Sequence, residues 1–225
     1  MFRAQIANTR TLLIPNTWGR FSCVNKRLVM SRVRLGAVLS FGLMLMLGGG
    51  QANALPGQTA EEVGAWIQAH PTLRPASGER LLVRKSDSAA QRFTFQASVL
   101  APGRVIPARD SSTIRSERLS IFDMINGVTR DRLEESLRVI YGLGVYQDYE
   151  RANLVYRYPG EATAFQARRR VTPLMAALQG ELRMGDRYAY WTEIAENRNG
   201  NAYAGHVVVF LKSDLNKLET ELRNR

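Results

Sequence analysis

Histidine is the side chain that most often acts as a general base near neutral pH, and the chain contains two. His206 lies in the stretch AGHVVVFL, whose composition predicts a strand that places it on the same face as Val208 and Phe210. One interpretation is a buried histidine bonded to a neighbour, because such a face is normally core. The other is a single catalytic acid or base, assisted by a carboxylate such as Asp186 or Glu193.

The second histidine, His70, is expected to end a helix rather than to act on a substrate. Thr59 and Glu62 have the spacing of a capping box that begins this helix, and Pro71 limits its end. A protonated imidazole at the carboxyl end of a helix suits the helix dipole. We therefore interpret His70 as a cap.

Other patterns that carry chemistry are missing from the sequence. It has no HExxH zinc motif, no GxSxG nucleophile elbow and no GxxxxGK phosphate loop. The one cysteine, Cys23, lies in a segment that we expect to be removed. The sequence therefore predicts no metal site and no cofactor, and it favours a protein that is not an enzyme.

Two groups of residues are candidates for binding. Arg168, Arg169 and Arg170 form the densest positive charge after residue 54, which fits either a solvated helix face or a site for an anionic partner. All eight tyrosines lie between residues 141 and 203, and Tyr188 and Tyr190 share one face of a predicted strand. Such a pair fits either cross-strand core packing or a binding surface.

The amino-terminal region has the three parts of a secretory signal peptide. Arg32 and Arg34 precede an apolar stretch of 13 residues, 35–47, which is shorter than the roughly 20 residues of a membrane-spanning helix. Small residues end the segment, so we expect cleavage between Ala54 and Leu55. A signal of ordinary length would begin at Met30, so residues 1–29 are either an amino-terminal extension or not translated.

This signal changes how the charge of the chain is interpreted. The net charge is +11, but residues 1–54 hold seven basic side chains and no acidic ones. Residues 55–225 keep 24 basic and 20 acidic side chains, a net charge of +4. The basic composition is therefore weak evidence for a nucleic-acid partner, and we expect none. We expect a protein of the periplasm or the extracellular space, without a stable membrane span after cleavage.

The predicted elements of residues 55–225 make a single α+β domain. Strands are predicted at 80–85, 91–100, 153–158, 180–184, 187–195 and 203–211, whereas 115–125 fits either a strand or a short helix. Helices are predicted at 59–70, 129–141 and 161–170, and a terminal helix is capped by Ser213. Its apolar stripe is Leu215, Leu218 and Leu222. We expect an antiparallel sheet of about four to six strands with helices packed on one face.

The sequence supports one principal functional hypothesis and one alternative. The principal hypothesis is an exported protein of the bacterial cell envelope that binds or assembles with an unidentified partner, either an anionic envelope component or a protein. The alternative is an envelope hydrolase that uses His206 and a carboxylate. A cleft that opens on His206, with a carboxylate in hydrogen-bond reach, favours the enzyme, and a sealed apolar surrounding favours the binding module.

Overall fold

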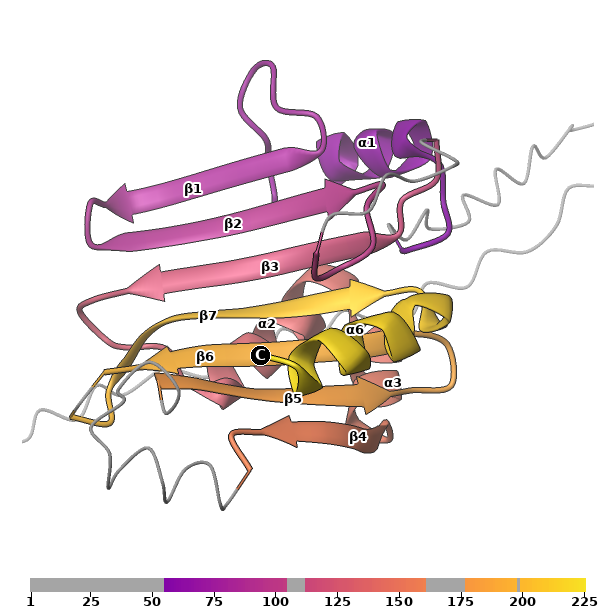
Figure 1. Ribbon diagram of the computed structural model, residues 1–225. Helices are drawn as coiled ribbons and strands as arrows, with labels where there is room; N and C mark the ends of the chain where they lie inside the picture. The colour runs from indigo at the N-terminus through magenta and orange to yellow at the C-terminus, as the bar shows by residue number, and fades with distance from the viewer. Residues whose placement is uncertain (1–54, 105–111, 161–176, 198) are drawn as a thin grey trace, which may run out of the picture. The chain divides into compact units, whose positions relative to one another are not determined.

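The computed structural model describes residues 55–104, 112–160, 177–197 and 199–225, all within one compact unit of residues 48–225. Its centre is a seven-stranded antiparallel sheet of strand order β1-β2-β3-β7-β6-β5-β4 (Figure 1). The strands are β1 (Leu82–Ser88), β2 (Gln91–Ser98), β3 (Ser116–Asp123), β4 (Asn153–Tyr158), β5 (Leu178–Met184), β6 (Ala189–Glu196) and β7 (Ala202–Phe210). The α+β class is confirmed, but the sheet has more strands than the four to six predicted.

Helices cover both faces of the sheet, which corrects the prediction of one covered face. On one face lie α1 (Ala60–Ala69), α2 (Arg130–Tyr141) and α3 (Leu143–Glu150), and on the other lies α6 (Leu215–Arg223) (Figure 1). The reason is visible in β7, where Val207 and Val209 belong to the first core and Val208 and Phe210 to the second. A continuous apolar run of this kind belongs to a strand that is buried on both sides.

The ambiguous segment 115–125 is largely strand β3, which pairs with β2 on one side and β7 on the other. The predicted helix at 161–170 lies outside the described residues. Within the described part of the chain, no helix is long and apolar enough to cross a membrane.

The first helix begins as predicted, with a complete capping box between Thr59 and Glu62. His70 is its carboxyl cap, but the expected charge is wrong. Its Nδ1 accepts from the amides of Thr72 and Leu73 at 3.2 Å each, and its Nε2 lies 3.0 Å from the carbonyl oxygen of Ile140. Burial lowers the pKa of His70, so a neutral ring that accepts at one nitrogen and donates at the other organises the chain after α1.

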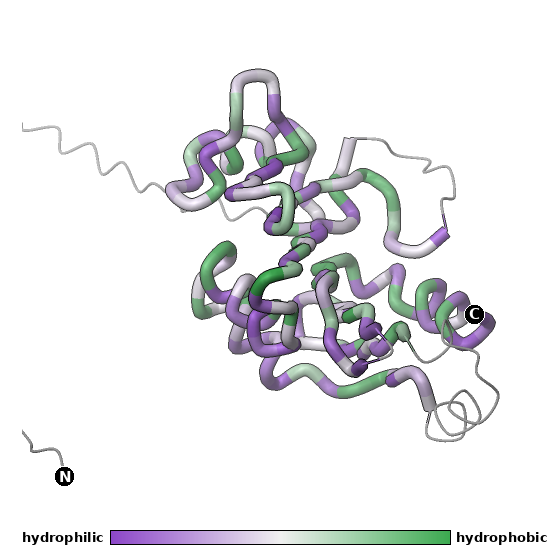
Figure 2. The backbone as a smooth tube through the Cα atoms, turned by 90° about the vertical axis from the view of Figure 1, so that its left-hand side faces the viewer, coloured by the Kyte–Doolittle hydropathy of each residue, from purple (hydrophilic) through white to green (hydrophobic). Residues whose placement is uncertain are grey.

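The terminal helix α6 packs as predicted, because Leu215, Leu218 and Leu222 are all buried against the sheet. Its polar positions alternate with these apolar ones along the backbone near the carboxyl terminus (Figure 2). The predicted cap is wrong: α6 follows a 3₁₀ turn, Lys212–Asp214, and Asp214 rather than Ser213 occupies the cap position. The Asp214 carboxylate instead binds Arg115.

Candidate binding groove

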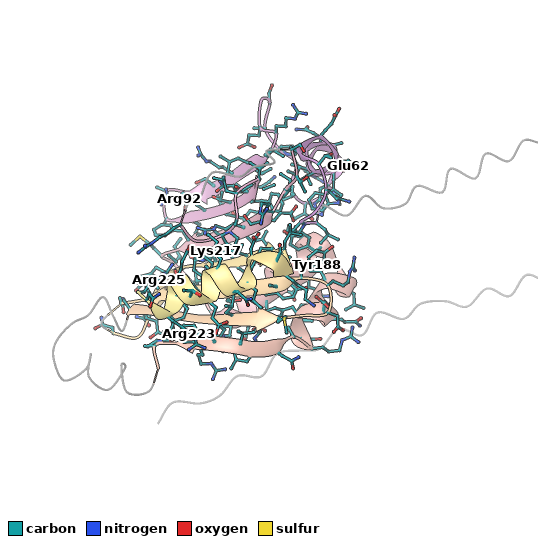
Figure 3. All side chains as sticks on the ribbon, turned by 45° about the vertical axis from the view of Figure 1, so that its right-hand side comes forward. Glu62, Arg92, Tyr188, Lys217, Arg223 and Arg225 are labelled. Atoms are coloured by element: carbon teal, nitrogen blue, oxygen red, sulfur yellow. The ribbon has the colours of Figure 1, made fainter. Side chains whose placement is uncertain are left out.

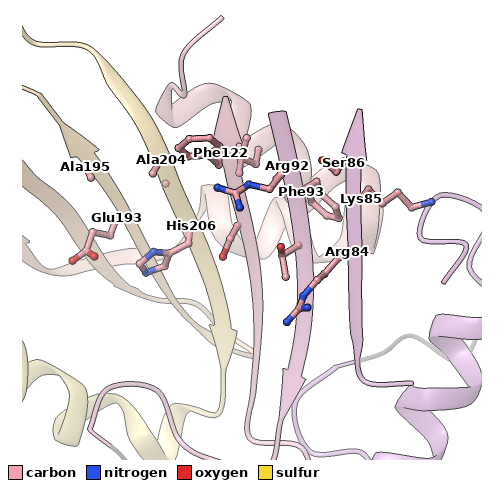
Figure 4. A pocket seen from close by; sticks show the side chains of 14 residues that line it. Arg84, Lys85, Ser86, Arg92, Phe93, Phe122, Glu193, Ala195, Ala204 and His206 are labelled. Carbon is pink, nitrogen blue, oxygen red and sulfur yellow. The ribbon is translucent and has the colours of Figure 1, made fainter. Parts of the chain in front are cut away.

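A single row of polar side chains crosses five strands on the face that carries α6. Arg84 of β1 lies opposite Thr94 of β2, which lies opposite Ser120 of β3. Ser120 in turn lies opposite His206 of β7, and His206 lies opposite Glu193 of β6. These five residues, which we call the polar row, come together only because the ladders between neighbouring strands share one register. Figure 4 shows Arg84, His206 and Glu193 of this row.

The polar row lies in a groove of about 640 Å³. A second row runs beside it, in which Arg92 lies opposite Phe122, Phe122 opposite Ala204, and Ala204 opposite Ala195. The small side chains of the two alanines leave the floor of the groove open. On the other side of the polar row, α6 packs against the neighbouring part of the sheet, so it leaves the groove uncovered.

One end of the groove is basic. Arg84 and Arg92 are exposed, and neither forms an ion pair with a carboxylate among the described residues. Arg92 lies opposite Ser86, two positions along β1 from Arg84, so the two guanidinium groups project from diagonal positions of one face. The Arg92 guanidinium carbon stands 4.6 Å from the centre of the Phe122 ring, which holds it in place (Figure 4).

The middle of the groove is neutral. The hydroxyls of Thr94 and Ser120 and the buried Nε2 of His206 have no hydrogen-bond partner within the described part of the chain. Burial, followed by the positive charges of Arg118 and Arg225, lowers the pKa of His206 to about 3. The ring is therefore uncharged at neutral pH, and it can donate from one nitrogen and accept at the other.

The far end carries a carboxylate that is already engaged. Glu193 accepts a hydrogen bond from Arg225 Nη1 at 2.7 Å and another from the hydroxyl of Tyr158. Arg225 follows α6 (Figure 3), and the Tyr158 oxygen also accepts from Trp191 Nε1 at 2.8 Å. The Tyr158 ring lies over Gly180, where a Cβ atom would come within 2.3 Å of it. Glu193 is thus neutralised and held by groups from β4, two strands away in the sheet, and from the chain end.

The structure brings together one of the two carboxylates proposed for His206. Glu193 is the cross-strand partner of His206, whereas Asp186 is not part of the site. Asp186 lies in the turn before Ala189, at the opposite end of β6, and its amide donates to Asp148. Successive residues of a strand advance about 3.4 Å, so Asp186 lies well beyond reach of the imidazole.

The tyrosine pair is largely a packing feature. Tyr190 is fully buried, and its hydroxyl donates to Asp148 Oδ2 at 2.6 Å. Tyr188 retains partial exposure at the edge of the same core (Figure 3). A binding role for Tyr188 stays a prediction. Arg168, Arg169 and Arg170, the other predicted binding residues, lie outside the described residues.

Comparison with protein-family models, with curated proteins and with solved structures found no match to this chain. Across the residues that the structure describes, no group of three or more histidine, cysteine, aspartate or glutamate side chains is placed to hold a metal ion. The functional argument therefore depends on the groove itself.

Sequence reasoning did not single out Arg84, Arg92, Thr94 or Ser120. Part of the signal is present in the sequence, because polar and apolar residues alternate in 91–100, and this pattern puts the polar residues of a strand on one face. The order in which five strands pair is set by tertiary contacts, however, and no local pattern places Arg84 in the same row as His206.

Proposed function

We propose that this protein is an exported module of the cell envelope whose groove binds an anionic ligand without catalysing a reaction. The expectation of export comes from the signal-like segment that ends at Ala54. The observation that carries the binding proposal is the polar row, in which a basic end without ion-pair partners continues into neutral groups without hydrogen-bond partners, as described above.

The basic end has the chemistry that an oxyanion requires. Each guanidinium presents a planar set of donors that fits a carboxylate or a phosphate. Arg84 and Arg92 repel each other when no anion lies between them, because like charges on one sheet face are unfavourable. A bound anion removes this repulsion and gains charge-assisted hydrogen bonds.

The hydrolase hypothesis has one observation in its favour, since a groove does open beside His206. Two others weigh against it. A base with a pKa of about 3 is a weak proton acceptor at neutral pH, and no carboxylate of the described residues orients the ring. Glu193 binds Arg225 and Tyr158 instead. The neutral His206 is better suited to hydrogen-bond a ligand than to remove its proton.

The arginines at 168–170 are a second predicted anion contact, and they stay a prediction. Binding by either group must weaken as salt rises, because exposed charges are screened. Variants that replace the arginines of one group at a time show whether the groove or residues 168–170 bind the anion.

Calorimetric titration of the full chain with pyrophosphate, a small anionic probe, tests the proposal. We compare three variants with the wild type. The first replaces both Arg84 and Arg92 by Gln, the second is a matched double variant of Arg138 and Arg151 on the opposite face, and the third is a triple variant at 168–170. Two lost charge-assisted bonds should weaken binding at least about tenfold in the groove variant, and the matched variant should stay close to wild type. Equal losses in both doubles, or a loss only in the triple variant, would refute the groove as the site.

A further inference from the structure

We infer that the ligand of the groove is an oligosaccharide that carries a carboxylate or a phosphate at one end. This inference rests on the proposed anion-binding function and adds the chemical class of the ligand and its direction in the groove.

The direction follows from the distribution of charge. Arg84 and Arg92 stand at the β1–β2 end, whereas the opposite end holds Glu193 with its charge balanced by Arg225. Between these ends, the polar row presents neutral groups only. Arg118 of β3 lies beside the row but does not line the groove, and its guanidinium lies over the Trp191 ring. A ligand that complements this arrangement has its anionic group over β1 and β2, and it is uncharged over β3 and β7.

The class follows from the two parallel rows. Along the polar row, the Thr94 and Ser120 hydroxyls and the neutral His206 ring both donate and accept hydrogen bonds. Along the neighbouring row, Ala204 and Ala195 offer apolar surface. A sugar ring has matching parts, because its rim of hydroxyls donates and accepts while its C–H face is apolar.

The size of the groove requires more than one ring. Arg84 and His206 lie three strand spacings apart, a distance of about 14 Å between their backbones. A single anion or a single monosaccharide cannot contact both. The groove volume of about 640 Å³ lies in the range of ordinary ligand pockets, roughly 300 to 1,000 Å³.

Two other extended anions fit less well. Single-stranded nucleic acid is bound by stacking its bases on open aromatic faces, and the groove aromatic Phe122 is covered by the Arg92 guanidinium. An extended acidic peptide gains most from the backbone groups of an edge strand, whereas this groove runs across the strands on a sheet face.

The test is calorimetric titration of the full chain with three trisaccharides that differ in linkage or in sugar unit: maltotriose, cellotriose and chitotriose. Each is used neutral and as its terminal aldonate, and maltotriose is also used as its 1-phosphate, which separates carboxylate from phosphate. Gluconate and glucose 1-phosphate are the single-residue controls, and a penta-aspartate peptide and an oligothymidylate are the competing classes. At least one acid-ended trisaccharide should bind at least tenfold more tightly than its neutral parent and than the corresponding single-residue acid.

A double variant, Thr94→Ala with Ser120→Ala, tests the neutral part of the groove. It should weaken binding of the acid-ended trisaccharide about tenfold and weaken binding of pyrophosphate much less, because a small anion held by Arg84 and Arg92 lies beside Thr94 but does not extend to Ser120. The inference is overturned if no acid-ended trisaccharide binds more tightly than the single-residue acids, or if the peptide or the oligonucleotide binds the groove more tightly. If pyrophosphate binding still depends on Arg84 and Arg92, the proposed function is supported although the ligand class is wrong. If pyrophosphate does not bind through these arginines, both the proposed function and the ligand class are refuted.

Discussion

His206 and Glu193 lie directly opposite each other in the β6–β7 ladder, yet no hydrogen bond joins their side chains. The Glu193 carboxylate is bound by Arg225 and Tyr158, and burial keeps the imidazole neutral. A histidine beside a free carboxylate would gain a proton more readily, and its pKa would rise. The observed arrangement instead gives the centre of the groove an uncharged hydrogen-bonding group.

The hydrogen bond from Tyr158 to Glu193 requires a glycine at position 180, because the Tyr158 ring lies over it. Gly180→Ala should displace the Tyr158 ring, because the new Cβ would lie 2.3 Å from it, and should cost about 1 to 3 kcal/mol of unfolding free energy. Gly144→Ala in helix α3 is the matched control, since nothing lies within 4 Å of its Cβ position, and it should be neutral or slightly stabilising. Urea denaturation measures both, and similar effects at the two positions would contradict the packing of Tyr158 over Gly180.

A buried carboxyl in the other core predicts an unusual pH dependence. Glu117 is fully buried, accepts a hydrogen bond from Tyr141 at 2.7 Å and leaves Oε1 without a partner among the described residues. Burial raises the pKa of Glu117 to about 7 from the ordinary 4.5. The folded state therefore holds this proton more tightly than the unfolded state, so the contribution is present below pH 4.5 and is lost as the pH rises through about 7.

Glu117→Gln removes this loss, because the amide is neutral at every pH and still accepts from Tyr141. The variant and the wild type should have similar unfolding free energies near pH 4.5, and near pH 8 the variant should be more stable by about 3 kcal/mol. His206 contributes an opposite slope at acid pH, but it does so in both proteins and cancels in the difference. A difference that stays constant with pH would show that the carboxyl does not titrate in this range.

The terminal helix should contribute strongly to stability. Leu218 has no exposed surface and packs in the core that includes Trp191 and Phe210, so Leu218→Ala should cost about 2 to 5 kcal/mol. Val139→Ala is the control, because Val139 is 49% exposed and its truncation should change stability by less than about 0.5 kcal/mol. A denaturation midpoint of Leu218→Ala that matches the control would mean that α6 is not firmly packed on the sheet.

Export predicts a defined mature amino terminus. Amino-terminal sequencing of protein recovered outside the cytoplasm should begin at Leu55, because small residues precede this position. Leu55 is itself 5% exposed and belongs to the first core, so cleavage at this bond leaves the core complete. An intact amino terminus in the membrane fraction would refute the prediction.

The sequence predicted the elements better than their assembly. The stripe Leu215, Leu218 and Leu222 located the terminal helix because helical periodicity is a local property, and the Thr59–Glu62 capping box located the start of α1 for the same reason. The packing of helices on both faces of the sheet was not predicted, although the continuous run of apolar residues in β7 indicates a strand that is buried on both sides. His206 was identified by its residue type alone.

The basic end of the groove could not be predicted from the sequence. Arg84 and His206 are 122 positions apart, and three separate ladders place them in one row. Residue type also does not reveal that the Glu193 carboxylate is already hydrogen-bonded, because its partners come from β4 and from the end of the chain. Long-range pairing decides both facts.

The most direct test of the groove is the position of a bound anion, measured by backbone amide chemical shifts during titration with pyrophosphate. The account predicts that the largest shifts occur at Arg84, Arg92 and Thr94, with smaller ones at Ser120, and that amides of α2 and α3 on the opposite face stay unchanged. Shifts that are largest at residues 168–170, that fall on the helices of the opposite face, or that are spread evenly over the surface would contradict it.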